Sequence, residues 1–259
     1  MISISVVSHA QLHLIHLLLE DIKQYCVADR LEIILTLNLT EELPFNVQDY
    51  PFRVKVLINA IQKGFAANHN AAFEQAQGEF FCVINPDIRL NGDPFPALEQ
   101  CLLEQGVGVA APLIFNEKGK VEDSARKFPT PFSLLGKALC IRRKMDYLIG
   151  DQSFYPDWVG GMFMLFRSDV FKEMEGFDAR YFLYYEDVDL CARLALRGYR
   201  ALICPQISVV HEAQRTSHRN LQYLGWHLSS AARFFMSRAF WAIKLRHPIS
   251  RDKISGNNL

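Results

Sequence analysis

The stretch GFAANHNAAFEQAQGEFFCVINPD, residues 64–87, decides the fold of this chain. Its first part, residues 64–76, consists mainly of small and helix-forming residues. Its second part is an apolar run, residues 79–84, that ends abruptly in Asn85-Pro86-Asp87. A helix followed by a buried strand predicts one unit of an α/β fold. Ligands of such folds bind at the carboxyl ends of the strands, so we expect a site beside Asn85 and Asp87.

The same alternation of strands and helices continues on both sides of this stretch. The expected strands are residues 2–7, 31–37, 52–58, 108–115 and 158–166, and the expected helices are 12–25, 95–105, 168–174 and 185–197. We therefore predict an α/β fold with a mostly parallel central sheet flanked by helices. The Pro- and Gly-marked region 116–157 is expected to form loops that cover the site. A helical pattern occupies the residues from 221 onward.

Composition is that of an ordinary globular protein. The chain has 259 residues, of which 50% are hydrophobic and 22% charged, enough for one sizeable core. Basic and acidic residues balance at 28 each, but residues 213–259 hold eight of the basic residues and only one acid, Asp252. The six cysteines include no C-x-x-C pair and are expected to be reduced. With neither a signal-peptide pattern nor an apolar run of about 18 residues, we expect a cytoplasmic protein without a membrane span.

Two acidic segments are candidates for chemistry. Asn85 and Asp87 would offer hard oxygen ligands to a phosphate-bound Mg²⁺ or Mn²⁺, although an Asn-Pro-Asp at a strand end is more often a capped turn. Residues 184–190 read Tyr-Tyr-Glu-Asp-Val-Asp-Leu and place three acids in four positions at the start of a predicted helix. They are either charges that favour the helix N-terminus or a general base whose pKa is raised by neighbouring charge and aromatic burial.

A histidine completes the set of candidates. His211 follows an apolar run, residues 207–210, and lies 24 residues beyond Asp187. A lone histidine at a strand end is usually a satisfied polar residue rather than a ligand. Its significance depends on the other blocks of the sequence.

These blocks occur in a fixed order along the chain. They are Gly64-Phe65-Ala66-Ala67-Asn68-His69-Asn70, Asn85-Pro86-Asp87, Trp158-Val159-Gly160-Gly161, Gly176-Phe177-Asp178, residues 184–190 and His211. Over roughly residues 1–240 the series resembles the family 2 inverting glycosyltransferases, and most of all the rhamnosyltransferase-like branch that builds bacterial surface polysaccharides. Each block alone is a weak signal, whereas the ordered series is specific.

The resemblance implies a GT-A fold and a division of labour along the chain. Residues 1–220 would form the glycosyltransferase domain, with a nucleotide-sugar-binding half, 1–115, and an acceptor-binding and catalytic half, 116–220. Residues 221–259 would form a basic amphipathic helical tail. The implied reaction moves a sugar from a nucleotide-sugar donor, with dTDP-rhamnose as the leading candidate, to a glycan or polyprenyl-diphosphate-linked acceptor in surface polysaccharide synthesis, for example of O-antigen. No nucleic acid is expected as a partner.

On the donor side, the resemblance assigns roles to five residues. Asp87 matches the ligand of the divalent metal, Mg²⁺ or Mn²⁺, and Asn85 stands where many relatives carry the first aspartate of a D-x-D motif. His211 matches a second metal or phosphate contact. Asn68 lies where the family contacts the donor nucleotide. Asn38 is the other candidate nucleotide contact, because the usual V-D-N-x-S reads Thr36-Leu37-Asn38-Leu39-Thr40 here and the aspartate is replaced by leucine.

On the acceptor side, the resemblance points to a base and a loop. Asp187 matches the catalytic base and Glu186 its acidic neighbour. Trp158, Gly160 and Gly161 match the loop that shapes the acceptor pocket. Arg215, a few residues after His211, is a candidate for holding an acceptor diphosphate.

Three alternatives remain open at this point. A nucleotidyltransferase also uses acidic metal ligands on an α/β sheet, but the first expected strand is not followed by a Gly-rich basic loop. The leucine at position 37 also leaves room for a non-catalytic binding or scaffolding module. The tail interleaves aromatic and basic residues between 233 and 246, which is typical either of a helix at a membrane surface or of a helix packed on the protein body.

Overall fold

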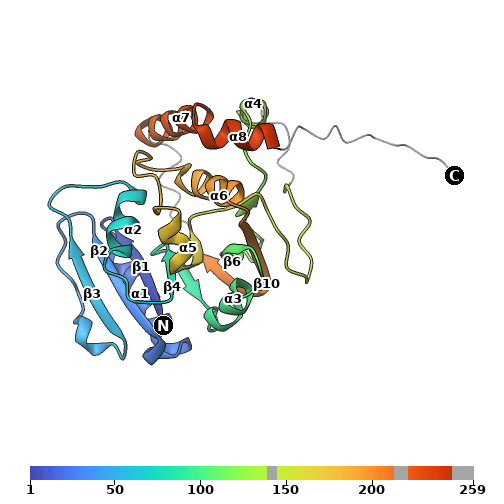
Figure 1. Cartoon of the computed structure of the whole chain (residues 1–259). Coiled ribbons are helices and arrows are strands. Elements are labelled where there is room, and N and C mark those ends of the chain that lie inside the picture. The colour runs from blue at the N-terminus through green and yellow to red at the C-terminus, as the bar shows by residue number, and fades with distance from the viewer. Residues whose placement is uncertain (139–144, 213–220, 247–259) are drawn as a thin grey trace.

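The computed structural model describes residues 1–138, 145–212 and 221–246 (Figure 1). Its centre is an eight-stranded sheet in the order β3-β2-β1-β4-β9-β6-β10-β5. The strands are β1 (Ile2–Ser8), β2 (Leu31–Leu37), β3 (Arg53–Ile58), β4 (Phe80–Ile84), β5 (Ile88–Leu90), β6 (Val107–Asn116), β9 (Phe163–Arg167) and β10 (Arg200–His211). Two short strands, β7 (Ala125–Arg126) and β8 (Trp158–Val159), form a separate antiparallel pair.

The predicted α/β class is confirmed, and the sheet is mixed in direction. β1 to β4 pair in parallel, as do β6 and β10. β9 runs antiparallel to both β4 and β6, and β5 runs antiparallel to β10. Strands from both predicted halves of the chain thus share one sheet, while the domain boundaries at residues 115 and 220 stay predictions.

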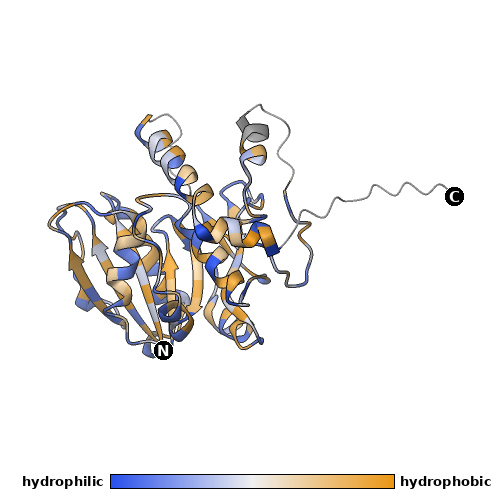
Figure 2. Cartoon of the chain, turned by 45° about the horizontal axis from the view of Figure 1, so that its top comes forward, coloured by the Kyte–Doolittle hydropathy of each residue, from blue (hydrophilic) through white to orange (hydrophobic). Residues whose placement is uncertain are grey.

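Helices cover both faces of the sheet (Figure 1). α1 (Leu12–Tyr25) and α3 (Phe95–Leu102) pack on one face. α2 (Phe65–Phe73), α5 (Ser168–Glu173) and α6 (Glu186–Leu196) pack on the other. Colouring by hydropathy shows the central strands as largely hydrophobic, as expected for a sheet buried on both faces (Figure 2).

A third apolar cluster joins the C-terminal helices to the body. α7 (Leu221–Phe235) and α8 (Arg238–Arg246) bury Phe234 and Phe240 against Tyr181 and Tyr185. These two phenylalanines therefore belong to the core, as expected for the second of the two alternatives, a helix packed on the protein body. Trp241, by contrast, is 52% exposed. In the described part of the chain, every helix falls short of the length and hydropathy that a bilayer span requires.

The structure departs from the predicted elements in four places. The long strand β10 (Arg200–His211) is signalled in the sequence only by the apolar run 207–210. The strand expected over 158–166 is interrupted at Gly160-Gly161-Met162, because its two halves pair with different sheets as β8 and β9. The region 116–157, expected as loops, also contains β7 and α4 (Pro131–Ala138). The short β5 was missed, since three residues after a proline-containing turn carry almost no periodic signal.

Candidate functional site

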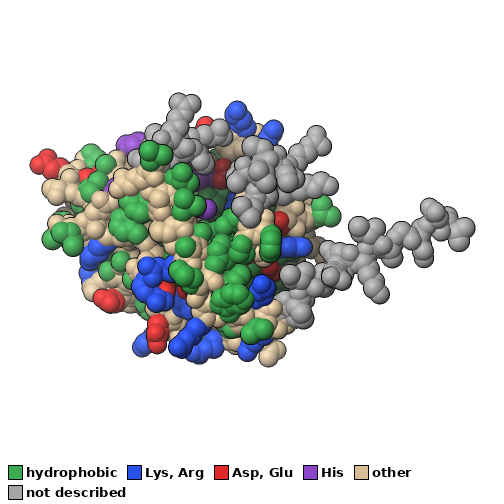
Figure 3. All heavy atoms as spheres, turned by 90° about the horizontal axis from the view of Figure 1, so that it is seen from above, with side chains coloured by type: hydrophobic (Ala, Val, Ile, Leu, Met, Phe, Trp, Pro, Cys, Tyr) green, Lys and Arg blue, Asp and Glu red, His purple; other side chains and the backbone are tan. Residues whose placement is uncertain are grey.

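A pocket of about 390 Å³ opens at the carboxyl ends of β1, β2 and β4, the edge at which this class of fold binds ligands. Four of the predicted site residues line it: Asn38, Asn68, Asn85 and Asp87. Tyr223 and Trp226 of α7 also contribute to its wall. Figure 3 looks down on this end of the molecule and shows a hollow in which histidine and acidic side chains gather, with hydrophobic side chains nearby.

One wall of the pocket is fixed by a network of asparagine side chains. Asn59 Nδ2 donates to Asn38 Oδ1 (2.9 Å) and to Asn68 Oδ1 (2.7 Å). Asn38 also accepts from the backbone N–H of Lys63 (2.8 Å) and donates to the Lys63 carbonyl (2.9 Å). Asn38 and Asn68 thus hold the 59–63 loop beside the pocket. Sequence reasoning missed Asn59, which follows an edge strand without any motif.

The Asn85-Pro86-Asp87 turn is anchored to the strands on both sides. The Asn85 N–H donates to the Met162 carbonyl at 2.9 Å, and the Asp87 carbonyl accepts from the Glu212 N–H at 2.8 Å. Just before the following helix, Asp93 Oδ1 accepts from the Phe95 N–H at 3.0 Å. Because Asp93 makes this hydrogen bond, the Asp87 carboxylate is available for another contact.

Asp87 meets His211 across the sheet. His211 Nε2 lies 3.2 Å from Asp87 Oδ2, and His211 Nδ1 lies 2.8 Å from Glu122 Oε2. Burial alone would lower the pKa of His211, but hydrogen bonds and charge from Asp87 and Glu122 outweigh it and raise the pKa to about 9. The predicted pairing of Asp87 with His211 therefore exists in the fold, whereas Glu122 had no sequence signal that singled it out.

The Asp87 and His211 side chains fit a divalent ion that is also bound to phosphate. Asp87 Oδ1 is buried and has no hydrogen-bond partner among the described residues, so it is left for a ligand. A carboxylate oxygen with an imidazole nitrogen suits Mn²⁺, and the carboxylate also suits Mg²⁺. Within residues 1–138, 145–212 and 221–246, no three His, Cys, Asp or Glu side chains are grouped to hold a metal by themselves. Phosphate oxygens and water would have to complete the coordination.

Asp187, the predicted base, lies near the N-terminus of α6. Its Oδ2 accepts from the Gly161 N–H (3.0 Å) and its Oδ1 accepts from the Val188 N–H (2.8 Å). Burial raises the pKa of Asp187, while these two hydrogen bonds and the charge of Arg126 oppose the rise. The net effect is a carboxyl with a raised pKa, as a general base requires.

Glu186 has a different environment from its neighbour. Its side chain is buried, and its Oε2 has no hydrogen-bond partner in the described parts of the chain. Burial, followed by the negative charge of Asp187, raises the pKa of Glu186 well above its ordinary value. The buried environment therefore favours the protonated form of Glu186, and the negative charge of Asp187 adds to this effect.

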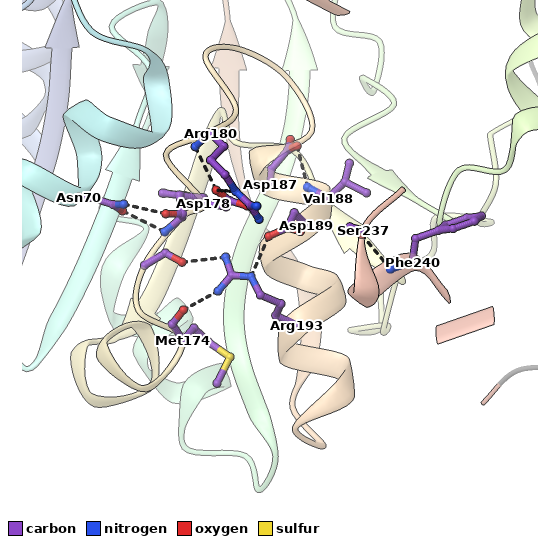
Figure 4. A network of polar contacts seen from close by, with 12 residues as sticks. Asn70, Met174, Asp178, Arg180, Asp187, Val188, Asp189, Arg193, Ser237 and Phe240 are labelled. Carbon is purple, nitrogen blue, oxygen red and sulfur yellow. Dashed lines mark hydrogen bonds and ion pairs between the residues drawn. The ribbon is translucent and has the colours of Figure 1, made fainter. Parts of the chain in front are cut away.

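The third acid of this segment, Asp189, has a structural role. Its Oδ2 accepts from Arg193 Nε at 2.7 Å, and Arg193 also donates to the carbonyls of Met174 and Gly176 (Figure 4). Asn70 of α2 fixes the same loop by two hydrogen bonds to the backbone of Phe177, at 2.7 and 2.9 Å. The network thereby connects α2, the 174–178 loop and α6, and it holds the helix that carries Asp187.

Backbone strain precedes the base. Tyr184 and Tyr185 both have φ of 69°, in the left-handed region that bulky residues disfavour. Two such residues in succession cost about 1–3 kcal/mol each, and strain of this kind clusters at functional sites. Tyr185 packs against Phe234 and Tyr184 against His227, so the C-terminal helices help to stabilise the strained turn.

The predicted acceptor loop lies against Asp187. Trp158 Nε1 donates to the Lys127 carbonyl at 3.0 Å, and the Arg126 guanidinium lies over the Trp158 ring at 5.5 Å. Gly160 N–H donates to the Ser124 carbonyl at 2.8 Å. A Cβ on Gly161 would lie 3.2 Å from the ring of Phe65, so only glycine fits there without a shift of that ring.

The predicted residues thus form two groups, one lining the pocket and one around Asp187, and the ring of Phe65 lies between them. Phe65 lines the pocket described above, and its ring lies next to Gly161, whose backbone N–H donates to Asp187. Gly161 therefore stands between the pocket and the base. Arg215, the predicted contact of an acceptor diphosphate, lies outside the described residues.

Sequence comparisons connect this arrangement to known proteins. The sequence model of the family described as "Glycosyltransferase like family 2" matches residues 35–224. The rhamnosyltransferase WbbL of Escherichia coli K12 is 30% identical over an alignment of 188 residues that covers 66% of this chain and 69% of that protein. An N-acetylglucosaminyl-diphospho-decaprenol L-rhamnosyltransferase of Mycobacterium tuberculosis is 28% identical over 235 residues, with 77% and 73% of the two chains covered.

Solved structures of low sequence identity share the fold. A mannosyltransferase from Pyrobaculum calidifontis, solved with GDP-Man and Mn²⁺, superposes with a TM-score of 0.62 at 18% identity and covers 90% of this chain. GalNAc-T7, solved with UDP, GalNAc and Mn²⁺, gives a TM-score of 0.67 at 14% identity and covers 99%. This chain spans 64% and 52% of the lengths of those two proteins. The likeness confirms the expected GT-A fold.

Proposed function

The chain belongs to glycosyltransferase-like family 2, and from that premise we propose that it is a metal-dependent inverting enzyme that transfers a sugar from a nucleotide-sugar donor to a hydroxyl group. The observation that carries the proposal is that the two candidate aspartates, Asp87 and Asp187, lie in two separate parts of the site. Asp87 faces His211 at the donor-side pocket, while Asp187 is held by the backbone of Gly161 on the other side of Phe65.

Asp187 is the general base in this proposal. It accepts the proton of the acceptor hydroxyl as that oxygen attacks the anomeric carbon on the face opposite the nucleotide, so the configuration inverts and no covalent sugar-enzyme intermediate forms. The raised pKa of Glu186 disfavours a second negative charge beside the reacting oxygen.

The donor diphosphate binds at Asn85, Asp87 and His211 in this proposal. Asp87 and His211 would hold a divalent ion, Mn²⁺ or Mg²⁺, and this ion would supply Lewis-acid stabilisation of the charge on the departing diphosphate. Asn38 and Asn68 shape the wall against which the nucleoside lies, and the exposed Lys63 offers a positive charge at the same pocket.

For the substrates, we propose dTDP-rhamnose as donor and a polyprenyl-diphosphate-linked glycan as acceptor in surface polysaccharide synthesis, O-antigen included. Two relatives support this choice, since both are named as rhamnosyltransferases and one is named for a diphospho-decaprenol acceptor. We further propose that the protein works at the cytoplasmic face of the inner membrane and contacts the bilayer through its C-terminal helices.

The test is a pair of measurements on purified protein. Sugar transfer is assayed with a panel of nucleotide sugars, and donor binding is followed as a rise in melting temperature with Mn²⁺ or Mg²⁺ present. We expect Asp187→Asn to abolish transfer while the donor-induced rise in melting temperature persists. Near-normal turnover of this variant would refute the role of Asp187. Donor binding without transfer or donor hydrolysis in the wild type would instead favour the non-catalytic module that the leucine at position 37 left open.

A further inference from the structure

The ring of His211 is held at both of its nitrogens. Nδ1 lies 2.8 Å from Glu122 Oε2, and Nε2 lies 3.2 Å from Asp87 Oδ2. The side chains of His211 and Glu122 are largely buried, at 12% and 24% exposure, so water competes little for the contact. A carboxylate on Nδ1 fixes the orientation of the ring and directs Nε2 toward Asp87.

The position of Glu122 is built by a rigid hairpin that leaves β6. Asn116 Oδ1 accepts from the N–H groups of Lys118 and Lys120, at 2.9 and 3.1 Å, and closes the turn. Gly119 adopts φ of 67°, which glycine permits at no steric cost. Glu122 N–H then donates to the Ile114 carbonyl at 2.7 Å. Glu122 is therefore fixed by its backbone and not only by its contact with His211.

We infer that Glu122 is a positioning residue for the metal site, and that it acts by holding the His211 ring so that Nε2 faces Asp87, where both side chains would bind a divalent ion. Glu122 itself faces the opposite ring nitrogen and is not a ligand. A histidine that binds a metal commonly donates its other N–H to a carboxylate, and loss of that partner lowers metal affinity by about 10–100-fold. The inference rests on the proposed function, because it concerns the metal that the donor diphosphate would share.

The segment that carries Glu122 also reaches the acceptor loop. Two residues further on, the Ser124 carbonyl accepts from Gly160 N–H at 2.8 Å. Ala125 and Arg126 then pair with Val159 and Trp158 in the β7-β8 ribbon. Backbone hydrogen bonds therefore hold both Ser124 and the β7-β8 ribbon in place. For this reason we expect a change of the Glu122 side chain to act on His211 without moving the acceptor loop.

The experiment measures Mn²⁺ affinity by isothermal titration calorimetry and by the loss of the free-Mn²⁺ EPR signal, with dTDP present to supply the diphosphate. We expect Glu122→Ala to weaken Mn²⁺ binding about 10–100-fold and Glu122→Gln, which keeps an acceptor oxygen, to weaken it less. Glu117→Ala is the matched control, because Glu117 is an exposed acid on the same hairpin. Each variant is first checked for a cooperative thermal transition, and Glu122→Gln provides the answer if the alanine variant does not fold.

The result separates this inference from the function on which it rests. If Asp87→Ala and His211→Ala lose Mn²⁺ affinity while Glu122→Ala and Glu122→Gln stay within about twofold of wild type, the role of Glu122 is wrong and the metal site stands. If neither Asp87→Ala nor His211→Ala changes Mn²⁺ affinity, the metal site and the role of Glu122 both fail. As a second readout, we expect Glu122→Ala to raise the KM for the donor more than it lowers kcat at saturating Mn²⁺.

Discussion

At the scale of single residues, the charge of Arg126 acts on the predicted base. Burial raises the pKa of Asp187, and Arg126 is among the groups that oppose this rise. Replacing Arg126 by Gln should therefore raise the pKa of Asp187 further. Because a base acts in its deprotonated form, activity on acidification should be lost at a higher pH than in the wild type.

The measurement is the pH profile of kcat, whose acidic limb reports the enzyme-substrate complex. Arg167→Gln is the control, since Arg167 pairs with Asp169 on the surface and does not appear among the groups that affect Asp187. An acidic limb that Arg126→Gln leaves unmoved, or moves to lower pH, would contradict the assignment of Asp187 as the base.

Glu186 gives a second prediction at this scale, on stability. Its pKa is raised well above the ordinary value of 4.5 in the folded protein, so over the pH range between these two values the folded state binds more protons than the unfolded state. Stability should therefore fall as pH rises through this range. Urea denaturation at a series of pH values should show a smaller decline for Glu186→Gln, which cannot ionise. An identical decline in the variant and the wild type would contradict the buried, protonated state of Glu186.

Among elements, the short strand β5 depends on a clamp from α1. Asp21 accepts two hydrogen bonds from the Arg89 guanidinium, both at 2.7 Å, and a third from Leu90 N–H at 3.0 Å. Because β5 follows Asp87 directly and pairs with the end of β10, this clamp also supports the Asp87 and His211 pair. We expect Asp21→Ala to lower the free energy of unfolding by about 1–3 kcal/mol, since it leaves partly buried donors without an acceptor.

Urea denaturation measures this loss. Glu20→Ala is the matched control on the same helix, because Glu20 pairs with Lys23 at the surface and should contribute about 1 kcal/mol or less. Equal stability of the two variants would show that the clamp does not hold β5 in place.

The sequence predicted those elements whose local pattern agrees with their final environment. Leu31–Leu37 and Leu12–Tyr25 were expected with the bounds that the structure shows, because a buried strand reads as a continuous apolar run and an amphipathic helix as a 3.6-residue period. β5 and β7 were missed because their pairing depends on long-range partners, Val209–His211 and Trp158–Val159. The left-handed backbone conformation of Tyr184 and Tyr185 could not be predicted from local propensity either, because tertiary packing enforces it.

At the scale of the whole molecule, the candidate site could be predicted only where a residue belongs to a motif. Asp87, Asp187 and His211 come from separate blocks, and the fold brings Asp87 and His211 within 3.2 Å. Glu122 takes part through its contact with His211, and Asn59 through hydrogen bonds to Asn38 and Asn68; nothing in their neighbours along the chain marks either residue. For the tail the sequence left two alternatives open, and the burial of Phe234 and Phe240 agrees with a helix packed on the protein body.

This burial changes how membrane contact should be tested. Truncation near Tyr223 would remove core residues and destabilise the protein, so point variants on α7 test membrane contact more specifically. Leu221, Leu224 and Leu228 follow one another at helical spacing and are 84%, 54% and 59% exposed, while Tyr223 and Trp226 of the same helix line the pocket. An apolar face beside the pocket mouth, with the exposed cations Arg238 and Lys244 on the next helix, suits an anionic bilayer that presents a lipid-linked acceptor.

We therefore expect the double variant Leu224→Gln and Leu228→Gln to bind vesicles of anionic phospholipid at least about tenfold more weakly than wild type, because each buried leucine contributes about 1.5–3 kcal/mol. Co-sedimentation with the vesicles measures this loss. Leu103→Gln is the control, because Leu103 is 70% exposed but follows α3, away from the pocket. Equal pelleting of the double variant and the wild type would exclude this face as the membrane contact. Weakening of the double variant alone would place the bilayer beside Tyr223 and Trp226.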